Sequence, residues 1–198
     1  MSMLHKAFCF DTKSFYGELA QIITISVSKE NVDDLLEFIR RNVDRITSPY
    51  TEEPIGDEGF KELAEMEIQE LIDFALTCYY NISEDIGLEY SWDAISEYLV
   101  LMNMKRDASF YILGESFCVN GFKLDPGRMG MGFIQAVAIS DIKKELISQQ
   151  EIFRDTIISK KIDPLYSLTK VELEDAYLSL IAIYEQAERE MKGLMFTF

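Results

Sequence analysis

Residues 169–192 carry the strongest helical signal in the chain. Thr169 and Glu172 match the S/T-x-x-E pattern of a capping box, in which both side chains accept hydrogen bonds from amide groups that the start of a helix leaves free. Gly193 follows, at a place where glycine commonly ends a helix, and residues 194–198 are predicted to form a final strand. We expect this long helix to pack against a sheet, so the chain has to supply further strands.

A second long helix is predicted over residues 59–80, because apolar residues recur there at helical spacing, beginning with Ala64. Acidic residues line its opposite side. A capping serine is predicted in front of three shorter helices, at Ser28, Ser91 and Ser140. The shorter predicted helices cover residues 30–43, 92–102 and 140–148, with further helix within 149–161 and a break at 160–164. The predicted strands cover residues 7–10, 22–28, 110–113 and 133–139.

Residues 46–58 contain two prolines, a glycine and four acidic residues, which predicts a long exposed loop. Apolar stripes lie on both sides of this loop, so it does not divide the chain. The sequence therefore predicts a single α+β domain over residues 1–198, with a mixed or antiparallel sheet and long flanking helices.

The negative charge is concentrated in one part of the chain. The net charge is −16, and residues 52–97 contribute −13 of it, with fourteen acidic residues and a single base, Lys61. Such a region sets up a local negative field. The surplus of acid excludes a non-specific nucleic-acid binder and a protein held on an anionic membrane, since both need lysine and arginine.

The sequence predicts a cytoplasmic protein. The first residues lack the continuous apolar stretch of a secretory signal, and no segment approaches the 18 apolar residues of a membrane-spanning helix. The three cysteines, Cys9, Cys78 and Cys118, are odd in number and far apart. We interpret them as small buried apolar residues and not as a disulfide framework.

Nothing in the residue spacing predicts a catalytic centre, a metal site or a cofactor. His5 is the only histidine, and we expect it to be exposed at a mobile terminus, which disfavours a nucleophile–histidine pair with Cys9. Metal-binding patterns of cysteine and histidine are absent. Acidic pairs three residues apart, such as Glu62 with Glu65, could share a cation, but a solvated helix face is the simpler interpretation.

Two further features have a structural and a functional interpretation. The loop of residues 125–133 could cradle an anion with Arg128, but its glycines match no phosphate-binding pattern, and turns with positive φ at Gly127, Gly130 or Gly132 are favoured. Trp92 is the only tryptophan and could belong to a pocket or form part of a half-buried core.

Roughly the C-terminal two-thirds of the chain carries an order of elements and a set of residues that match a known family. The matching positions are Trp92 with Asp93, Leu113 to Glu115, Gly130 with Gly132, Ser140 with Asp141, and Gly193. On these grounds, and on the order of elements more than on any one residue, the chain resembles the YfbM-like family of uncharacterised bacterial proteins. Ser96 stands where that family often has a histidine. The resemblance implies an α+β fold and a soluble bacterial protein, and it implies no reaction.

These observations favour a bacterial protein that acts by binding and is not an enzyme. We expect Glu62, Glu65 and Asp73 to steer an acidic face onto a basic protein, as an immunity or antitoxin-like inhibitor does with a nuclease. The alternative is a small-ligand-binding protein or enzyme. Its pocket would be formed by Trp92, Asp93, Glu115 and Arg128.

Overall fold

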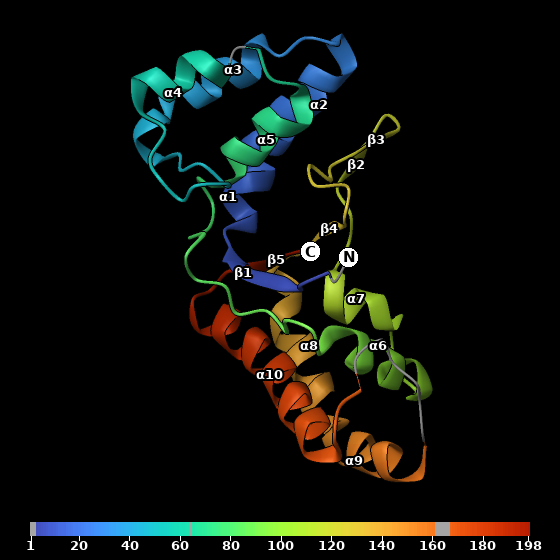
Figure 1. Ribbon diagram of the computed structural model, residues 1–198. Coiled ribbons are helices and arrows are strands. Elements are labelled where there is room, and N and C mark those ends of the chain that lie inside the picture. Colours follow the sequence, from blue (N-terminus) through green and yellow to red (C-terminus); the bar gives the residue numbers. More distant parts are fainter. Residues whose placement is uncertain (1–2, 64, 161–166) are drawn as a thin grey trace.

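A three-stranded antiparallel sheet lies at the middle of the molecule, between two groups of helices (Figure 1). The computed structural model describes residues 3–63, 65–160 and 167–198. The strand order is β1–β5–β4, with β1 at Lys6–Phe10, β5 at Gly193–Thr197 and β4 at Met131–Ile134. In register, Phe8 of β1 and Phe133 of β4 both pair with Met195 of β5.

The helices of the first half form one lobe, which we call the N-terminal lobe. Its helices are α1 (Thr12–Gly17), α2 (Leu19–Lys29), α3 (Asp33–Arg41), the short 3-10 helix η1 (Val43–Arg45), α4 (Gly56–Leu63) and α5 (Ile68–Leu76). A small hairpin of β2 (Cys118–Val119) and β3 (Phe122–Lys123) extends beside this lobe (Figure 1).

The remaining helices form the C-terminal lobe on the other side of the sheet. They are α6 (Trp92–Leu101), α7 (Ala108–Leu113), α8 (Ala136–Ser148), α9 (Gln150–Ser159) and α10 (Lys170–Arg189). Figure 1 shows α8 and α10 running away from the sheet towards α9. The architecture is the predicted α+β class, and its three-stranded sheet is antiparallel.

Side chains alternate across the strands, so the sheet supplies both lobes with core residues. Along β1, Ala7 and Cys9 belong to the apolar core of the C-terminal lobe. Phe8 and Phe10 belong to the core of the N-terminal lobe. Burial on both faces explains why this strand reads as an unbroken apolar run and not as an alternating one.

The predictions for the two ends of the chain are confirmed. β1 and β5 form where strands are predicted, and Thr169 and Glu172 make the expected capping box in front of α10. Gly193 does not end α10, however, because Met191 takes the left-handed conformation there, with φ 56°. Gly193 is instead the first residue of β5, where a Cβ would overlap the carbonyl oxygen of Ile134.

The strand predicted at 22–28 is wrong, since these residues lie in α2. A strand would place Ile23 and Ile25 on one face, yet Ile23 is fully buried and Ile25 is 42% exposed. The hydroxyl of Thr24 donates to the carbonyl of Ala20, which satisfies this polar group within the helix. Ser28 is therefore inside α2 and caps nothing.

The long helix predicted over 59–80 is also wrong, because the chain forms α4 and α5 with a turn between them. Glu67 and Glu70 make a capping box that starts α5 afresh. The loop predicted at 46–58 is shorter than expected, because α4 already begins at Gly56, and Ile46 is buried. The apolar position at Ala64 and the predicted break after residue 160 fall outside the described residues.

Three smaller predictions need correction. Residues 110–113 belong to helix α7 and not to a strand. The strand predicted at 133–139 ends at Ile134, and α8 begins at Ala136, so Ser140 lies inside that helix. Cys9 is buried and Cys78 is half-buried, but Cys118 is exposed.

Among the described residues, no helix combines the length and the apolar character needed to span a membrane.

Candidate functional site

The acidic residues of the 52–97 region are divided among three parts of the molecule. Of the acidic residues of this region whose exposure the structure describes, six exposed glutamates lie in the N-terminal lobe, namely Glu52, Glu53, Glu62, Glu65, Glu67 and Glu70. The exposed Glu84, Asp85 and Glu89 follow in the segment that connects the lobes, and Asp93 and Glu97 lie on α6. The region therefore does not form one helical face, and the N-terminal lobe carries its densest part.

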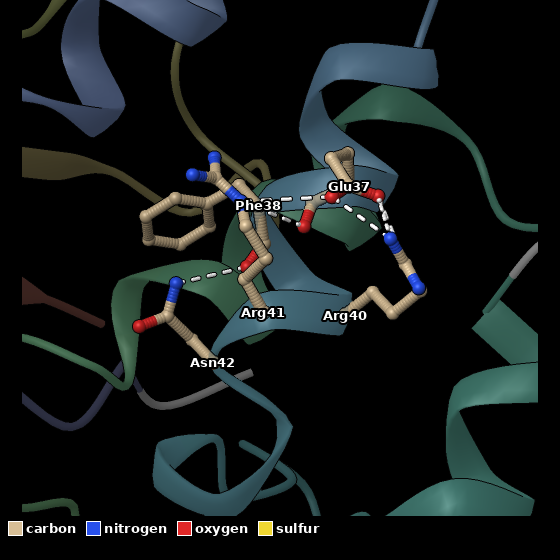
Figure 2. Close-up of polar contacts among 5 residues, drawn as sticks. All are labelled: Glu37, Phe38, Arg40, Arg41 and Asn42. Carbon is tan, nitrogen blue, oxygen red and sulfur yellow. Dashed lines mark hydrogen bonds and ion pairs between the residues drawn. The ribbon is translucent and has the colours of Figure 1, made fainter.

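Helix α3 places cations in the same lobe, but these pair within their own helix. The guanidinium of Arg40 donates two hydrogen bonds of 2.9 Å to the carboxylate of Glu37 (Figure 2). Arg41 donates to the main-chain carbonyl of Glu37 and lies 3.8 Å from its carboxylate. Because Glu37 already balances part of this positive charge, α3 leaves the negative field of α4 and α5 largely in place.

Glu62 lies on the rim of a groove of about 290 Å³ between α4, α5 and the loop before α4. Glu53 shares that rim. The other lining residues are Ser48, Thr51, Pro54, Ile55, Gly59, Leu63, Met66 and Phe74. The groove thus combines an apolar floor with two exposed carboxylates, and Glu65 lies just beyond it in the turn after α4.

Asp73 is not part of this acidic surface, contrary to the prediction that it shares a face with Glu62 and Glu65. It lines a different cavity, of about 170 Å³, between α5 and the sheet. The other lining residues are Lys6, Phe8, Pro49, Tyr80, Ile82, Pro126, Gly127, Met131, Met195, Thr197 and Phe198. Burial raises the pKa of the Asp73 carboxyl to about 6, and a hydrogen bond from Tyr50 opposes this shift.

Tyr50 connects the two cavities. Its side chain is 65% exposed, its ring meets that of Phe74 edge-on with 5.8 Å between centroids, and its hydroxyl reaches Asp73. Phe74 lines the groove, whereas Asp73 lines the cavity beside the sheet. An exposed aromatic residue at such a place is typical of a binding surface. Sequence reasoning missed Tyr50, whose only signal is an aromatic residue between two prolines.

Trp92 and Asp93 lie at the start of α6. The indole nitrogen of Trp92 donates to the carbonyl of Met3, and its ring packs edge-on against Phe198 with 4.6 Å between centroids. Trp92 is half-buried and contacts the core of the C-terminal lobe. These contacts favour the half-buried-core interpretation of Trp92.

Glu115 lines an open depression of about 710 Å³ beside α7, together with Lys105, Arg106, Asp107 and Ser109. Trp92, Asp93 and Arg128 are not among its lining residues, so this depression does not gather the four residues that the sequence grouped. It is completed by Met104, Phe110 and Gly114, and the guanidinium of Arg106 lies 4.1 Å from the centre of the Phe110 ring.

Arg128 lies in a tight turn, as the structural interpretation of the 125–133 loop predicts. The carboxylate of Asp125 accepts a hydrogen bond from the amide of Gly130, and the Asp125 carbonyl accepts one from the amide of Arg128. Gly130 has the expected positive φ, 115°, whereas Gly127 and Gly132 do not. The turn thus uses its amides internally and holds a carboxylate, which disfavours an anion cradle.

His5 is fully buried, so the prediction of an exposed histidine at a mobile terminus is wrong. Its Nε2 lies 2.7 Å from the carbonyl oxygen of Ile112, and its Nδ1 accepts a 3.0 Å hydrogen bond from the amide of Leu88. Burial lowers the pKa of His5 and raises the pKa of the Cys9 thiol to about 12. His5 therefore joins the segment between the lobes to α7 as a neutral structural residue.

Within the described ranges, no three histidine, cysteine, aspartate or glutamate residues are grouped so that they could hold a metal ion. Comparison with known proteins adds no relative, since no protein-family model, curated protein or solved structure matches this chain. The groove of Glu53 and Glu62, with Tyr50 and the Asp73 cavity next to it, is the best-defined candidate site.

Proposed function

We propose that this chain is a cytoplasmic bacterial binding protein that docks a basic protein through its N-terminal lobe. The supporting observation is the groove in which Glu53 and Glu62 border an apolar floor. We extend the proposal to kinship with the YfbM-like proteins, on the order of elements in the second half of the chain. That kinship adds no reaction.

The two parts of the groove contribute different terms to binding. Exposed carboxylates attract a cationic partner over roughly a Debye length, which raises the association rate more than the final affinity. The apolar lining residues that remain accessible, Pro54, Ile55 and Met66, supply surface whose burial slows dissociation. A basic partner with apolar residues among its cations fits both parts, and an immunity or antitoxin-like role against a basic enzyme such as a nuclease is the form we favour.

The docking proposal is tested by charge reversal at residues that the structure places on the surface. Glu53, Glu62 and Glu65 are changed together to lysine, and proteins captured from host lysate are compared with those that the unchanged chain captures. The matched control reverses Asp155, Asp175 and Glu185, three exposed acids of the C-terminal lobe. Both variants gain the same charge, so loss of a partner in the first variant alone supports docking on the N-terminal lobe.

A second function is a small-ligand site in the depression of Glu115. The specific observation is that Lys105 and Arg106 face the same depression as Asp107 and Glu115, so a polar ligand with both charges would find partners there. Its test is a screen of small polar metabolites by ligand-observed NMR, with Glu115→Gln and Arg106→Gln as variants. Saturable binding that both variants weaken would favour this site over protein docking.

A further inference from the structure

The cavity beside the sheet is partly open and joins a carboxylate to apolar side chains. Asp73 reaches it from α5, and the lining combines apolar groups, among them Phe8, Tyr80, Met131 and Met195, with the polar side chains of Lys6 and Thr197. At about 170 Å³ the cavity is several times larger than the space of one water molecule, so it has room for a short chain of non-hydrogen atoms.

We propose that this cavity receives a lysine side chain presented by the basic partner, with the ammonium group paired to Asp73. The inference rests on the proposed docking function and names the anchor of that docking. Tyr50 stands between this cavity and the groove of Glu53 and Glu62, so one partner segment can occupy both.

The chemistry of the walls selects such a group. The methylenes of lysine would contact the apolar walls, and its ammonium would meet the carboxylate of Asp73 beside the ring of Tyr80. Lys6 lines the same cavity, but burial and Tyr50 are what act on the Asp73 carboxyl, so an uncharged apolar side chain would cover the carboxylate without supplying a counter-charge. An anion would be repelled by Asp73.

A proton is coupled to this binding, because Asp73 has to be ionised to pair with the ammonium. The ionisable side chains around it are Lys6 from β1, Tyr50 from the loop before α4 and Tyr80 after α5. Strands β4 and β5 contribute Met131, Met195 and Thr197, which do not titrate. Burial and the nearby Asp73 charge raise the pKa of Tyr50 and Tyr80 above 10, so both tyrosines stay neutral near pH 7.

With the carboxyl pKa at about 6, the ionised fraction of Asp73 falls about tenfold between pH 7 and pH 5. The apparent affinity for an ammonium group in the cavity should fall by the same factor of about ten. A site built from exposed glutamates alone would change much less over this range.

The experiment uses Nα-acetyl-lysine N-methylamide as the probe and the methionine methyl groups of the full chain as reporters in NMR. Met131 and Met195 line the cavity, whereas Met191 is 87% exposed and serves as the internal reference. The uncharged comparison ligand is Nα-acetyl-norleucine N-methylamide. Asp73→Asn is the test variant and Glu185→Gln is the matched control, since Glu185 is an exposed residue of α10 in the C-terminal lobe, outside both the cavity and the groove.

We expect saturable shifts at Met131 and Met195 with the lysine probe at pH 7. Binding should be at least tenfold weaker with the norleucine probe and in Asp73→Asn, and about tenfold weaker at pH 5. Glu185→Gln should bind the lysine probe as the unchanged chain does. Absence of these shifts, or equal binding by the norleucine probe or by Asp73→Asn, would overturn the inference. The pH comparison and the norleucine comparison are both made on the unchanged chain, so they test the inference even if Asp73→Asn does not fold. Binding of the lysine probe to the cavity does not require Glu53. Failure of the lysine inference therefore leaves the docking proposal standing, and the charge reversal of the groove residues tests that proposal separately.

Discussion

Replacing Asp73 with asparagine should make the protein more stable at pH 7. The carboxylate of Asp73 is only partly exposed and lies among apolar side chains, so its charged form is poorly solvated in the folded state. Asparagine has nearly the same shape and can still accept the hydrogen bond from Tyr50. The substitution therefore removes a charge without opening a cavity.

The pKa of Asp73 gives the size of the effect. The carboxyl has a pKa of about 6 in the folded protein, compared with 3.8 for an ordinary aspartate. Each pKa unit corresponds to about 1.4 kcal/mol, so ionised Asp73 costs the folded state about 3 kcal/mol at pH 7. Because the folded pKa is the higher one, this cost is absent below about pH 4 and grows until the pH passes about 6. At pH 5 about half of it remains.

Urea unfolding of the unchanged chain and of Asp73→Asn at pH 5, 6 and 7 measures this cost. The variant should be more stable by about 3 kcal/mol at pH 7 and by about half as much at pH 5. Taking the difference between the two proteins removes the contribution of His5, which both contain. Glu62→Gln should change the free energy of unfolding by less than about 0.5 kcal/mol at every pH. An Asp73→Asn protein that is no more stable at pH 7, or whose gain does not depend on pH, would refute the reasoning.

Three other outcomes follow from the packing. Replacing Leu71 or Leu180 with alanine should cost about 2–5 kcal/mol in urea unfolding, because both are fully buried, and a cost near zero at both would contradict the placement of α5 and α10. Calorimetry should show one unfolding transition, since both cores share the sheet, and two separate transitions would contradict this. His5→Ala should cost about 1–3 kcal/mol for the unpaired amide of Leu88 alone. Burial lowers the pKa of His5, so its contribution to stability should disappear as the pH falls below about 6.5. The cost of His5→Ala should therefore shrink in acid. A cost that does not change with pH would contradict the structural role of His5.

Elements with a local signal could be predicted from the sequence. The capping box of Thr169 and Glu172 is a contact between neighbours in the chain, so it is visible without the fold. Residues 22–28 could not be assigned from the local sequence. Their β-branched residues favour a strand, but they also fit a helix in which the hydroxyl groups donate hydrogen bonds to main-chain carbonyls one turn earlier. Packing against α1 and α3 decides between the two, and these contacts between helices cannot be read from the spacing of residues along the chain.

The candidate site was predicted only in part, and the split between α4 and α5 explains why. On one continuous helix, Glu62, Glu65 and Asp73 would share an exposed side. The turn before Glu67 changes the direction of the chain, and α5 is buried on most of its surface. Asp73 therefore lies on the side of α5 that faces the sheet. Tyr50 could not have been found from spacing, because its position depends on a loop folded against Phe74.

If the acidic groove of the N-terminal lobe attracts a basic protein, the association rate must depend on salt, and this dependence is the most direct test of docking. The association rate constant of a purified partner is measured at ionic strengths from about 0.02 to 0.5 M, over which the Debye length shrinks severalfold. We predict that the rate constant of the unchanged chain falls steeply as the ionic strength rises, and that the variant reversed at Asp155, Asp175 and Glu185 behaves in the same way. The variant reversed at Glu53, Glu62 and Glu65 should associate more slowly, and its rate constant should hardly depend on salt. Equal slopes for the two reversals would contradict the claim.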